Sequence, residues 1–206
     1  MQFDPDDMSV RDIYGWMVGL ITPRPIAWVS TLSIDGIANL APFSFFNGVG
    51  GNPPTIVFCP ANNREGRPKD TLANIQRTGQ FAVNLVTAAD VEAMNLTSAD
   101  FAADEDEFAL ASIAKAPCDR IDVPRVAQAA ATLECQLHSA IQLGTGPGGA
   151  NLVIGRVVYL HVSDAVVDET GRLRADKLDT IGRMGGAQYV RTSDRFEMPR
   201  PKRPTV

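Results

Sequence analysis

Two long β-strand patterns near the C-terminal end of the chain place the strongest limit on its fold. Residues 131–143 and 151–162 are rich in β-branched and other apolar residues, and the segment GTGPGGA separates them. Clusters of glycine and proline end one strand and turn the chain into the next. The two segments therefore predict a long hairpin in a fold dominated by sheet.

The same glycine-rich segment also matches the dinucleotide-binding pattern G-x-G-x-x-G, through Gly144, Gly146 and Gly149. That pattern binds a pyrophosphate only where a helix begins at the motif and directs its first N–H groups toward the anion. Here the sequence NLVIGRVVYLHV follows, which is typical of a strand. We interpret the segment as a hairpin tip and exclude a Rossmann-type site.

Further elements follow from breakers and periodicity. Asp35-Gly36 is a turn signal between two strand-like segments, and Gly79 stands where a helix usually ends. The expected helices are residues 10–20, 71–77 and 88–96, and the expected strands are 26–32, 37–46, 55–59 and 81–86. Residues 97–124 are acidic and irregular, with room for one helix. Six or so strands with peripheral helices favour a mainly β fold, a closed antiparallel barrel over a sandwich.

Composition limits the class of protein and its partners. The chain has 206 residues, 45% hydrophobic and 21% charged, and a net charge of −5. We expect one domain, 1–206, with a core of about 20–192 and an extended tail at 193–206. The charge argues against nucleic acid or an acidic membrane as partner, and no apolar run reaches the roughly 20 residues of a membrane helix. The N-terminus lacks the features of a signal peptide.

Cysteine usage suggests the compartment. Cys59, Cys118 and Cys135 are odd in number and show no CxxC spacing. This favours reduced thiols in the cytoplasm over a disulfide framework or a metal site. We expect no metal ligand, and we interpret His138 and His161 as structural or surface residues.

The segment TPRPIAWVSTLSIDGIANLAPFSFFN keeps polar groups inside an apolar hairpin. The main chain of residues 27–31 and the hydroxyls of Ser30 and Thr31 could bind the edge of a flat heterocycle, with Ser44 and Asn47 on the opposite side. Trp28 could cover a ring or fill the core, and the phenylalanines nearby fit the core. Ser44 and Asn47 could also lie on the solvent face of a strand.

A second polar segment, GRPKDTLANI, precedes and opens the helix at 71–77. Asp70 or Thr71 would cap this helix, whose first-turn N–H groups favour a negative group. Arg64, Arg67 and Lys69 lie just upstream, so the segment fits either a monophosphate site or a solvated basic loop. The carboxylates at 104–107 are interpreted as a solvated face, and no G-x-S-x-G hydrolase motif is present.

These segments, with PPTIVF, KDTLANIQRTGQFAVN, GRVVYLHV and IGRMGGAQY, resemble the flavin reductase-like family with an FMN-binding split barrel. The family includes flavoredoxin-like proteins and the reductase components of two-component monooxygenases. The resemblance runs from about Thr22 to Tyr189 and is loose between Thr97 and Pro124.

The resemblance implies a six-stranded antiparallel Greek-key split barrel that forms a homodimer, with FMN near the subunit interface. It implies hydride transfer from NADH or NADPH to flavin N5 without a catalytic side chain, and possible supply of reduced flavin to a partner monooxygenase. Two alternatives stay open: a flavoredoxin-like electron carrier or ferric reductase with permanently bound FMN, and a non-enzymatic flavin-binding module. The residues expected to contact the cofactor are Trp28, Val29, Ser30, Thr31, Ser44, Phe46, Asn47, Arg64, Lys69, Asp70, Thr71, Gly186 and Tyr189.

Overall fold

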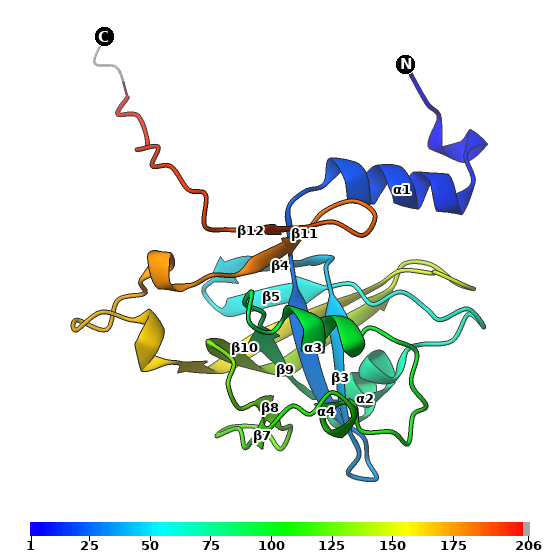
Figure 1. Ribbon diagram of the computed structural model, residues 1–206. Coiled ribbons are helices and arrows are strands. Elements are labelled where there is room, and N and C mark those ends of the chain that lie inside the picture. Colours follow the sequence, from blue (N-terminus) through cyan, green and yellow to red (C-terminus); the bar gives the residue numbers. More distant parts are fainter. Residues whose placement is uncertain (204–206) are drawn as a thin grey trace.

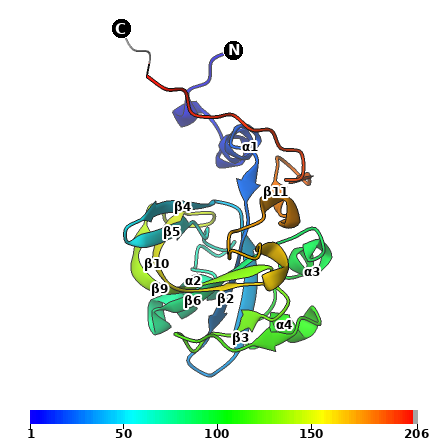
Figure 2. The same ribbon diagram turned by 90° about the vertical axis from the view of Figure 1, so that its left-hand side faces the viewer.

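A strongly curved antiparallel sheet forms the body of the protein in the computed structural model, which describes residues 1–203 (Figure 1). The strand order is β3-β2-β6-β9-β10-β5-β4, and each neighbouring pair is antiparallel. Figure 2 shows the sheet curling back on itself around an enclosed interior. The strands are β2 (Ala27–Leu32), β3 (Ala38–Phe43), β4 (Phe46–Gly51), β5 (Pro54–Phe58), β6 (Gln80–Leu85), β9 (Ala131–Gln142) and β10 (Asn151–Val162).

Smaller elements surround this sheet. One small sheet contains β1 (Arg24–Pro25), β11 (Ile181–Arg183) and β12 (Tyr189–Arg191), and another pairs β7 (Lys115–Ala116) with β8 (Arg125–Val126). The helices are α1 (Val10–Leu20), α2 (Asp70–Thr78), α3 (Val91–Leu96) and α4 (Glu107–Leu110), with short 3-10 turns at Pro5–Asp7, Asp164–Val166 and Ala175–Lys177. In Figure 1, α1 extends beyond the barrel, next to β11 and β12.

The barrel is split between β3 and β4, which are consecutive in the chain but lie at opposite ends of the strand order. Residues 37–46 were expected to form one strand. Instead the chain turns at Ser44 and Phe45, and β4 pairs with β5. The expected count of six strands was therefore wrong, whereas the mainly β antiparallel class is confirmed. Across the split, the rings of Phe43 and Phe58 lie 5.2 Å apart.

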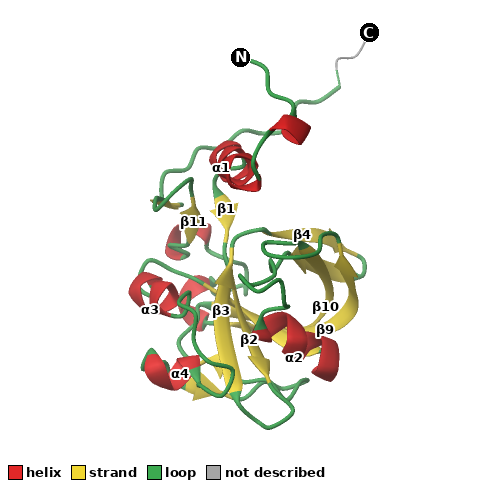
Figure 3. Cartoon of the chain, turned by 90° about the vertical axis from the view of Figure 1, so that its right-hand side faces the viewer, coloured by secondary structure: helices red, strands yellow, loops and turns green. Residues whose placement is uncertain are grey.

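Two apolar clusters lie on the two faces of β2. Ala27 and Val29 face the barrel interior, where Leu72 and Ile75 of α2 close the core with Phe81 and other residues. Trp28 faces the other way and belongs to a cluster that includes Met94 of α3 and Phe108 of α4. Because successive side chains of a strand alternate between faces, β2 is buried on both sides. Figure 3 shows α2 beside β2 and β3.

The predicted hairpin of β9 and β10 is confirmed, with residues 143–150 at its tip. The ring of Phe81 occupies the space where a Cβ at Gly155 would stand, 2.4 Å from the nearest ring carbon. Only glycine fits this close approach. The helix ending at Gly79 is also confirmed, because Gly79 adopts the left-handed conformation with φ of 70°.

The C-terminal part contains two strands that the sequence analysis did not predict. Residues 181–191 form the β11–β12 hairpin, which pairs with β1 near the start of the chain. Residues 194–203 of the predicted tail form no helix or strand, and its last residues, 204–206, fall outside the described part of the chain. Among residues 1–203, no helix has the length and apolar character needed to cross a membrane.

Candidate functional site

Helix α2 packs against β2 and β3, and its first turn is tied to β3 by the hydrogen bond from Thr71 to Asn39. Lys69 is the N-cap residue, with extended backbone, and within the described chain it makes no side-chain capping hydrogen bond. The expectation that Asp70 or Thr71 caps this helix was wrong, because the Thr71 hydroxyl donates to Asn39 Oδ1 at 2.8 Å instead. The first N–H groups of a helix have no partner inside it. This helix start can therefore accept an anion.

The loop before α2 is a tight, ordered turn. Asn63 Oδ1 accepts from the N–H groups of Glu65 and Arg67 at 3.1 and 2.8 Å. The turn leaves Arg64 and Arg67 exposed. Lys69 Nζ lies 4.0 Å from Asp100 Oδ1, and the two side chains are 42% and 77% exposed, so this ion pair holds Lys69 only weakly. The cationic side chains are free to turn toward a ligand at the helix start.

The glycine-rich tip of the β9–β10 hairpin packs on this loop. The N–H of Asn62 donates to Gly149 O at 2.8 Å, and its side-chain amide donates to Gly146 O at 3.1 Å. Asn151 Nδ2 donates to Asn62 Oδ1 at 2.9 Å. A Cβ at Gly149 would stand 2.6 Å from Gly144 O. The glycines thus allow close backbone approach to the basic loop, and the sequence analysis missed Asn62 and Asn151.

A buried polar network joins α2 to the sheet. Asn39 Oδ1 accepts from Thr31 at 3.1 Å as well as from Thr71, and Asn74 Nδ2 donates to the Thr31 hydroxyl at 3.1 Å. Asn39 Nδ2 in turn donates to Glu107 Oε1 at 2.6 Å. The start of α2 is therefore fixed to β2 and β3 through side chains.

Glu107 corrects the expectation that the carboxylates at 104–107 form a solvated face. It is buried, with 7% of its surface exposed, and its second oxygen accepts from Leu40 N at 3.1 Å. Burial raises the pKa of this carboxyl, against the smaller opposing effect of its hydrogen bonds. Its position at the start of α4, directly before the buried Phe108, explains why it points inward.

Three other predicted site residues lie deep in β2 and are fully buried. Trp28 Nε1 donates to Thr97 Oγ1 at 2.9 Å, and Ser30 Oγ accepts from Asn84 Nδ2 at 3.2 Å, both on the face opposite Thr31. Val29 packs in the barrel interior. Residues 27–30 pair with β3 on one side and β6 on the other. The main chain of residues 27–30, which we expected to bind the edge of a heterocycle, is therefore occupied by strand pairing, and the cofactor contacts of these three residues stay predictions.

A second group of predicted residues gathers around Arg24. Arg24 is buried, and burial lowers the pKa of its guanidinium. Its Nη1 donates to Val18 O and Ile21 O at 2.5 and 2.6 Å, and Nη2 donates to Met184 O at 3.0 Å. Its Nε donates to Ser44 Oγ at 3.4 Å. Arg24 thereby holds the end of α1, the Ser44 turn and the β11–β12 loop together.

The β11–β12 loop carries Gly186 and Tyr189. Gly186 has a positive φ of 60°, and its carbonyl accepts from Arg183 Nη2 at 2.6 Å. The Arg183 guanidinium lies 4.4 Å from the Tyr189 ring centre. This stacking fixes the tyrosine ring beside the loop.

Phe46 and Asn47 start β4. Phe46 packs against the barrel core, whereas Asn47 is exposed and its Oδ1 accepts from Gly48 N. The structure thus brings Thr31 to the start of α2, and Ser44 to the β11–β12 loop. No hydrogen bond or ion pair within residues 1–203 joins these two groups. Two surface hollows of about 500 and 560 Å³ lie elsewhere, along residues 115–124 and beside β8 and β10.

The sequence matches the family described as flavin reductase like domain over residues 19–180. This chain belongs to the flavin reductase-like family. The resemblance found in the sequence is thereby confirmed, and the matched region contains both the α2 start and the Ser44 turn.

Solved structures agree with this assignment. Nitrilotriacetate monooxygenase component B from Bacillus cereus is 34% identical, with a TM-score of 0.91 over 96% of this chain and 98% of that chain. The 2-nitrobenzoate 2-nitroreductase NbaA of Pseudomonas fluorescens is 33% identical, with a TM-score of 0.88 over 98% of this chain and 96% of that chain. A flavin reductase with a split barrel domain from Shewanella frigidimarina is 22% identical, with a TM-score of 0.81 over 98% and 100% of the two chains. This last likeness supports the split-barrel fold.

Proposed function

We propose that this member of the flavin reductase-like family binds FMN and reduces flavin with NADH or NADPH. The observation that carries the proposal is the start of α2, which has no side-chain cap and is fixed to the barrel through Thr71 and Asn39. Helix N–H groups and nearby cations are the donors that a phosphate requires. Arg64 and Lys69 supply the cations, so the residues present fit the phosphate of FMN.

The ring portion of the ligand has a second set of candidate contacts. Ser44, Asn47, Gly186 and Tyr189 carry hydroxyl, amide, main-chain and aromatic groups suited to a flat polar heterocycle. In our proposal Arg24 positions this set, because it bonds to the Ser44 turn and to the β11–β12 loop at once. Thr31 has its hydroxyl engaged in the Asn39 network, which leaves its role as support for α2.

We further propose a homodimer with the flavin near the subunit interface. The exposed side of α1 carries Val10, Tyr14, Met17 and Leu20, each at least 45% exposed. Their spacing places them along one side of the helix, and Figure 1 shows α1 projecting beyond the barrel. An apolar helix face in this position suits a second copy of the chain.

The bound FMN would supply the hydride-accepting chemistry, with NADH or NADPH as the donor. The chain itself needs to bind the phosphate, hold the ring and leave one face open to the nicotinamide. No proton transfer by a side chain is needed in this scheme. A monooxygenase partner that consumes reduced flavin is part of the proposal, supported by the similarity to a Bacillus cereus protein named as a monooxygenase component.

An anaerobic titration tests the activity. The purified chain is mixed with FMN, then with NADH or NADPH, and the visible absorbance of the flavin is followed with and without excess free FMN. Loss of absorbance and catalytic consumption of nicotinamide are expected. If the chain binds FMN but the flavin stays oxidised after addition of either NADH or NADPH, the proposed flavin reductase activity is contradicted. That result would favour an electron carrier.

A second candidate is direct reduction of a nitroarene at the bound flavin. It is favoured by the 33% identity to a protein named 2-nitrobenzoate 2-nitroreductase. Nicotinamide oxidation that needs a nitrobenzoate and does not respond to added free FMN would support this candidate. Oxidation that rises with free FMN alone would support the flavin reductase.

A further inference from the structure

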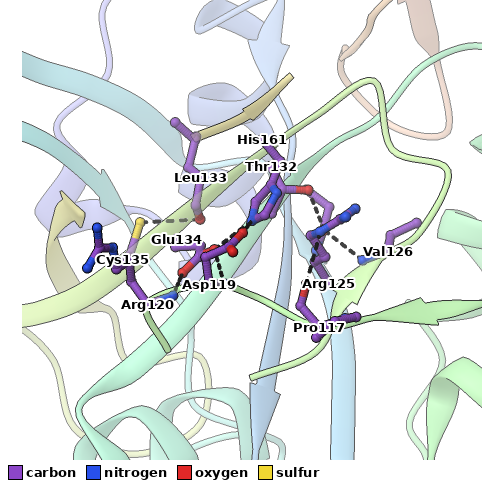
Figure 4. A network of polar contacts seen from close by, with 11 residues as sticks. Pro117, Asp119, Arg120, Arg125, Val126, Thr132, Leu133, Glu134, Cys135 and His161 are labelled. Atoms are coloured by element: carbon purple, nitrogen blue, oxygen red, sulfur yellow. Dashed lines mark hydrogen bonds and ion pairs between the residues drawn. The ribbon is translucent and has the colours of Figure 1, made fainter. Parts of the chain in front are cut away.

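A cluster of potential metal ligands lies where the β9–β10 hairpin meets the segment between β7 and β8. Glu134 is on β9, His161 is on β10, and Cys118 belongs to the segment. One ligand atom from each of these three residues lies within 4.8 Å of the other two. His161 Nε2 is 2.5 Å from Glu134 Oε1 and 3.5 Å from Asp119 Oδ2. Figure 4 shows the His161 ring directed at these two carboxylates.

The centre of the cluster is built into the fold. Glu134 is fully buried, and the segment folds onto it, because the N–H groups of Asp119 and Arg120 donate to its two oxygens at 2.7 Å each. Register places His161 opposite Thr132, two residues from Glu134 along β9. Neighbouring strands thus hold the imidazole and carboxylate on one side of the sheet. No spacing motif marks these ligands in the sequence, since successive ligands are 16 and 27 residues apart.

The chemistry and size of the cluster match a zinc site. Thiolate, imidazole and carboxylate are the ligands that Zn²⁺ takes in proteins. In a tetrahedral site, ligand atoms lie roughly 3.3–3.8 Å apart, because metal–ligand bonds are about 2.0–2.3 Å long. The present separations approach these values, so rotations of Cys118, His161 and the exposed Asp119 would suffice.

We propose that Cys118, Glu134 and His161 bind a Zn²⁺-like divalent cation, with Asp119 as a fourth ligand. The site fastens the 117–124 segment to β9 and β10. None of its residues belongs to the proposed flavin site, so this inference stands apart from the proposed function. The earlier expectation of no metal ligand came from the lack of CxxC spacing, which does not apply to ligands brought together by sheet pairing.

An ion can reach the cluster from solvent. Cys118 lines the hollow of about 500 Å³ along residues 115–124, and His161 lines the hollow of about 560 Å³ beside β8 and β10. Burial and then the charge of Glu134 raise the pKa of the Cys118 thiol to about 12. A bound cation lowers the pKa of a coordinating thiol, and the thiol proton passes to solvent on binding.

The test uses the full chain purified without a histidine tag, with its metal content measured before treatment with a chelator. Co²⁺ is then added, and the difference spectrum against the metal-free protein is recorded so that flavin absorbance cancels. We expect one Co²⁺ per chain, a thiolate-to-cobalt charge-transfer band, visible bands of tetrahedral intensity, and loss of all of these when Zn²⁺ is added. Thermal unfolding should shift upward with Zn²⁺, because a ligand that binds the folded state stabilises it.

Matched variants assign the ligands. Cys118→Ser should abolish the charge-transfer band, while Cys59→Ser, a free thiol outside the cluster, should keep it. His161→Gln should weaken Co²⁺ binding at least ten-fold, and His138→Gln, an exposed histidine on the same hairpin, should not. If His161→Gln fails to fold, the Cys118→Ser spectrum decides. A wild-type chain that shows no thiolate band with Co²⁺, or a band that survives Cys118→Ser, would overturn the site and leave a plain Glu134–His161 ion pair.

Discussion

Asn39 connects two strands and two helices through one side-chain amide. Its oxygen accepts from Thr31 and Thr71, and its nitrogen donates to Glu107, so its orientation is fixed from both ends. Asn39 is one of the polar residues that the sequence places inside an apolar hairpin. It could not show that the polar groups satisfy one another, because the partners are 32 and 68 residues away. A buried network of this kind accounts for polar residues in a strand without any ligand.

The burial of Glu107 predicts a pH dependence of stability. Desolvation raises the pKa of its carboxyl in the folded protein above that in the unfolded chain, so the folded state holds the proton more tightly. Its contribution to the free energy of unfolding is full below the unfolded pKa and is lost as pH rises through the folded pKa. Denaturant unfolding of the wild type across this range should show that decline, and Glu107→Gln should remove it.

Glu105→Gln serves as the matched control, since Glu105 is exposed on the same segment. It should leave the decline in place. An identical pH profile for the wild type and Glu107→Gln would contradict the buried, proton-binding role of Glu107.

Lys69→Ala should weaken FMN binding more than riboflavin binding, because only FMN carries the phosphate. A hydrogen bond to a charged group contributes about 1.5–3 kcal/mol, which corresponds to roughly ten-fold to a hundred-fold in the dissociation constant. The loss of FMN affinity should be toward the lower end of this range, since the Lys69 side chain is 42% exposed. Fluorescence titration with both flavins measures the difference. Arg77→Ala, at the other end of α2, should change neither the FMN nor the riboflavin affinity. If Lys69→Ala weakens both flavins equally, Lys69 does not belong to the phosphate site.

At the scale of elements, the sequence predicted where helices and strands lie along the chain better than which strands pair. The bounds of α1, α2 and the β9–β10 hairpin agree with the structure to within about a residue, because each has strong periodicity and a clear breaker. The turn at Ser44 was missed, since nothing local in FSFF marks a turn; the contact that accompanies it comes from Arg24, 20 residues earlier. β11 and β12 were missed because strands of three residues are too short to show alternation.

The glycine-rich tip offers a prediction for the contact between the hairpin and the basic loop. Gly149→Ala places a Cβ 2.6 Å from Gly144 O and 2.9 Å from Asn62 Nδ2, so the tip must shift away from the loop. The expected cost is about 1–3 kcal/mol of stability, measured by denaturant unfolding. Gly50→Ala, where a Cβ meets no heavy atom within 4 Å, is the control. If Gly149→Ala is as stable as the wild type, the close contact between the hairpin tip and the basic loop does not contribute to stability.

For the whole molecule, the arrangement of α1 raises the question of what covers it. Its C-terminal end is tied to the body through Arg24, and a Cβ at Gly185 would lie 3.4 Å from Gly19. The helix nevertheless keeps a row of large apolar side chains in solvent, with Leu20 at 74% exposed and Val10 at 75%. Monomeric proteins rarely leave a contiguous patch of this kind uncovered. Composition and periodicity predicted the helix. They did not predict that its apolar side chains are exposed, because exposure depends on how the rest of the chain packs.

Leu20→Asp tests the proposed homodimer. A charge placed in an apolar interface has to be desolvated without a partner, so the variant should sediment as a monomer where the wild type sediments as a dimer. Ile34→Asp makes the same chemical change at a 67% exposed position in the β2–β3 turn, on the side of the molecule away from α1 (Figure 1), and should remain dimeric. If the flavin lies near the interface, Leu20→Asp should also lose FMN affinity while its circular dichroism stays that of a folded chain. Equal sedimentation of the wild type and Leu20→Asp would exclude α1 from the interface, and a dimer that dissociates without losing FMN would place the cofactor within one subunit.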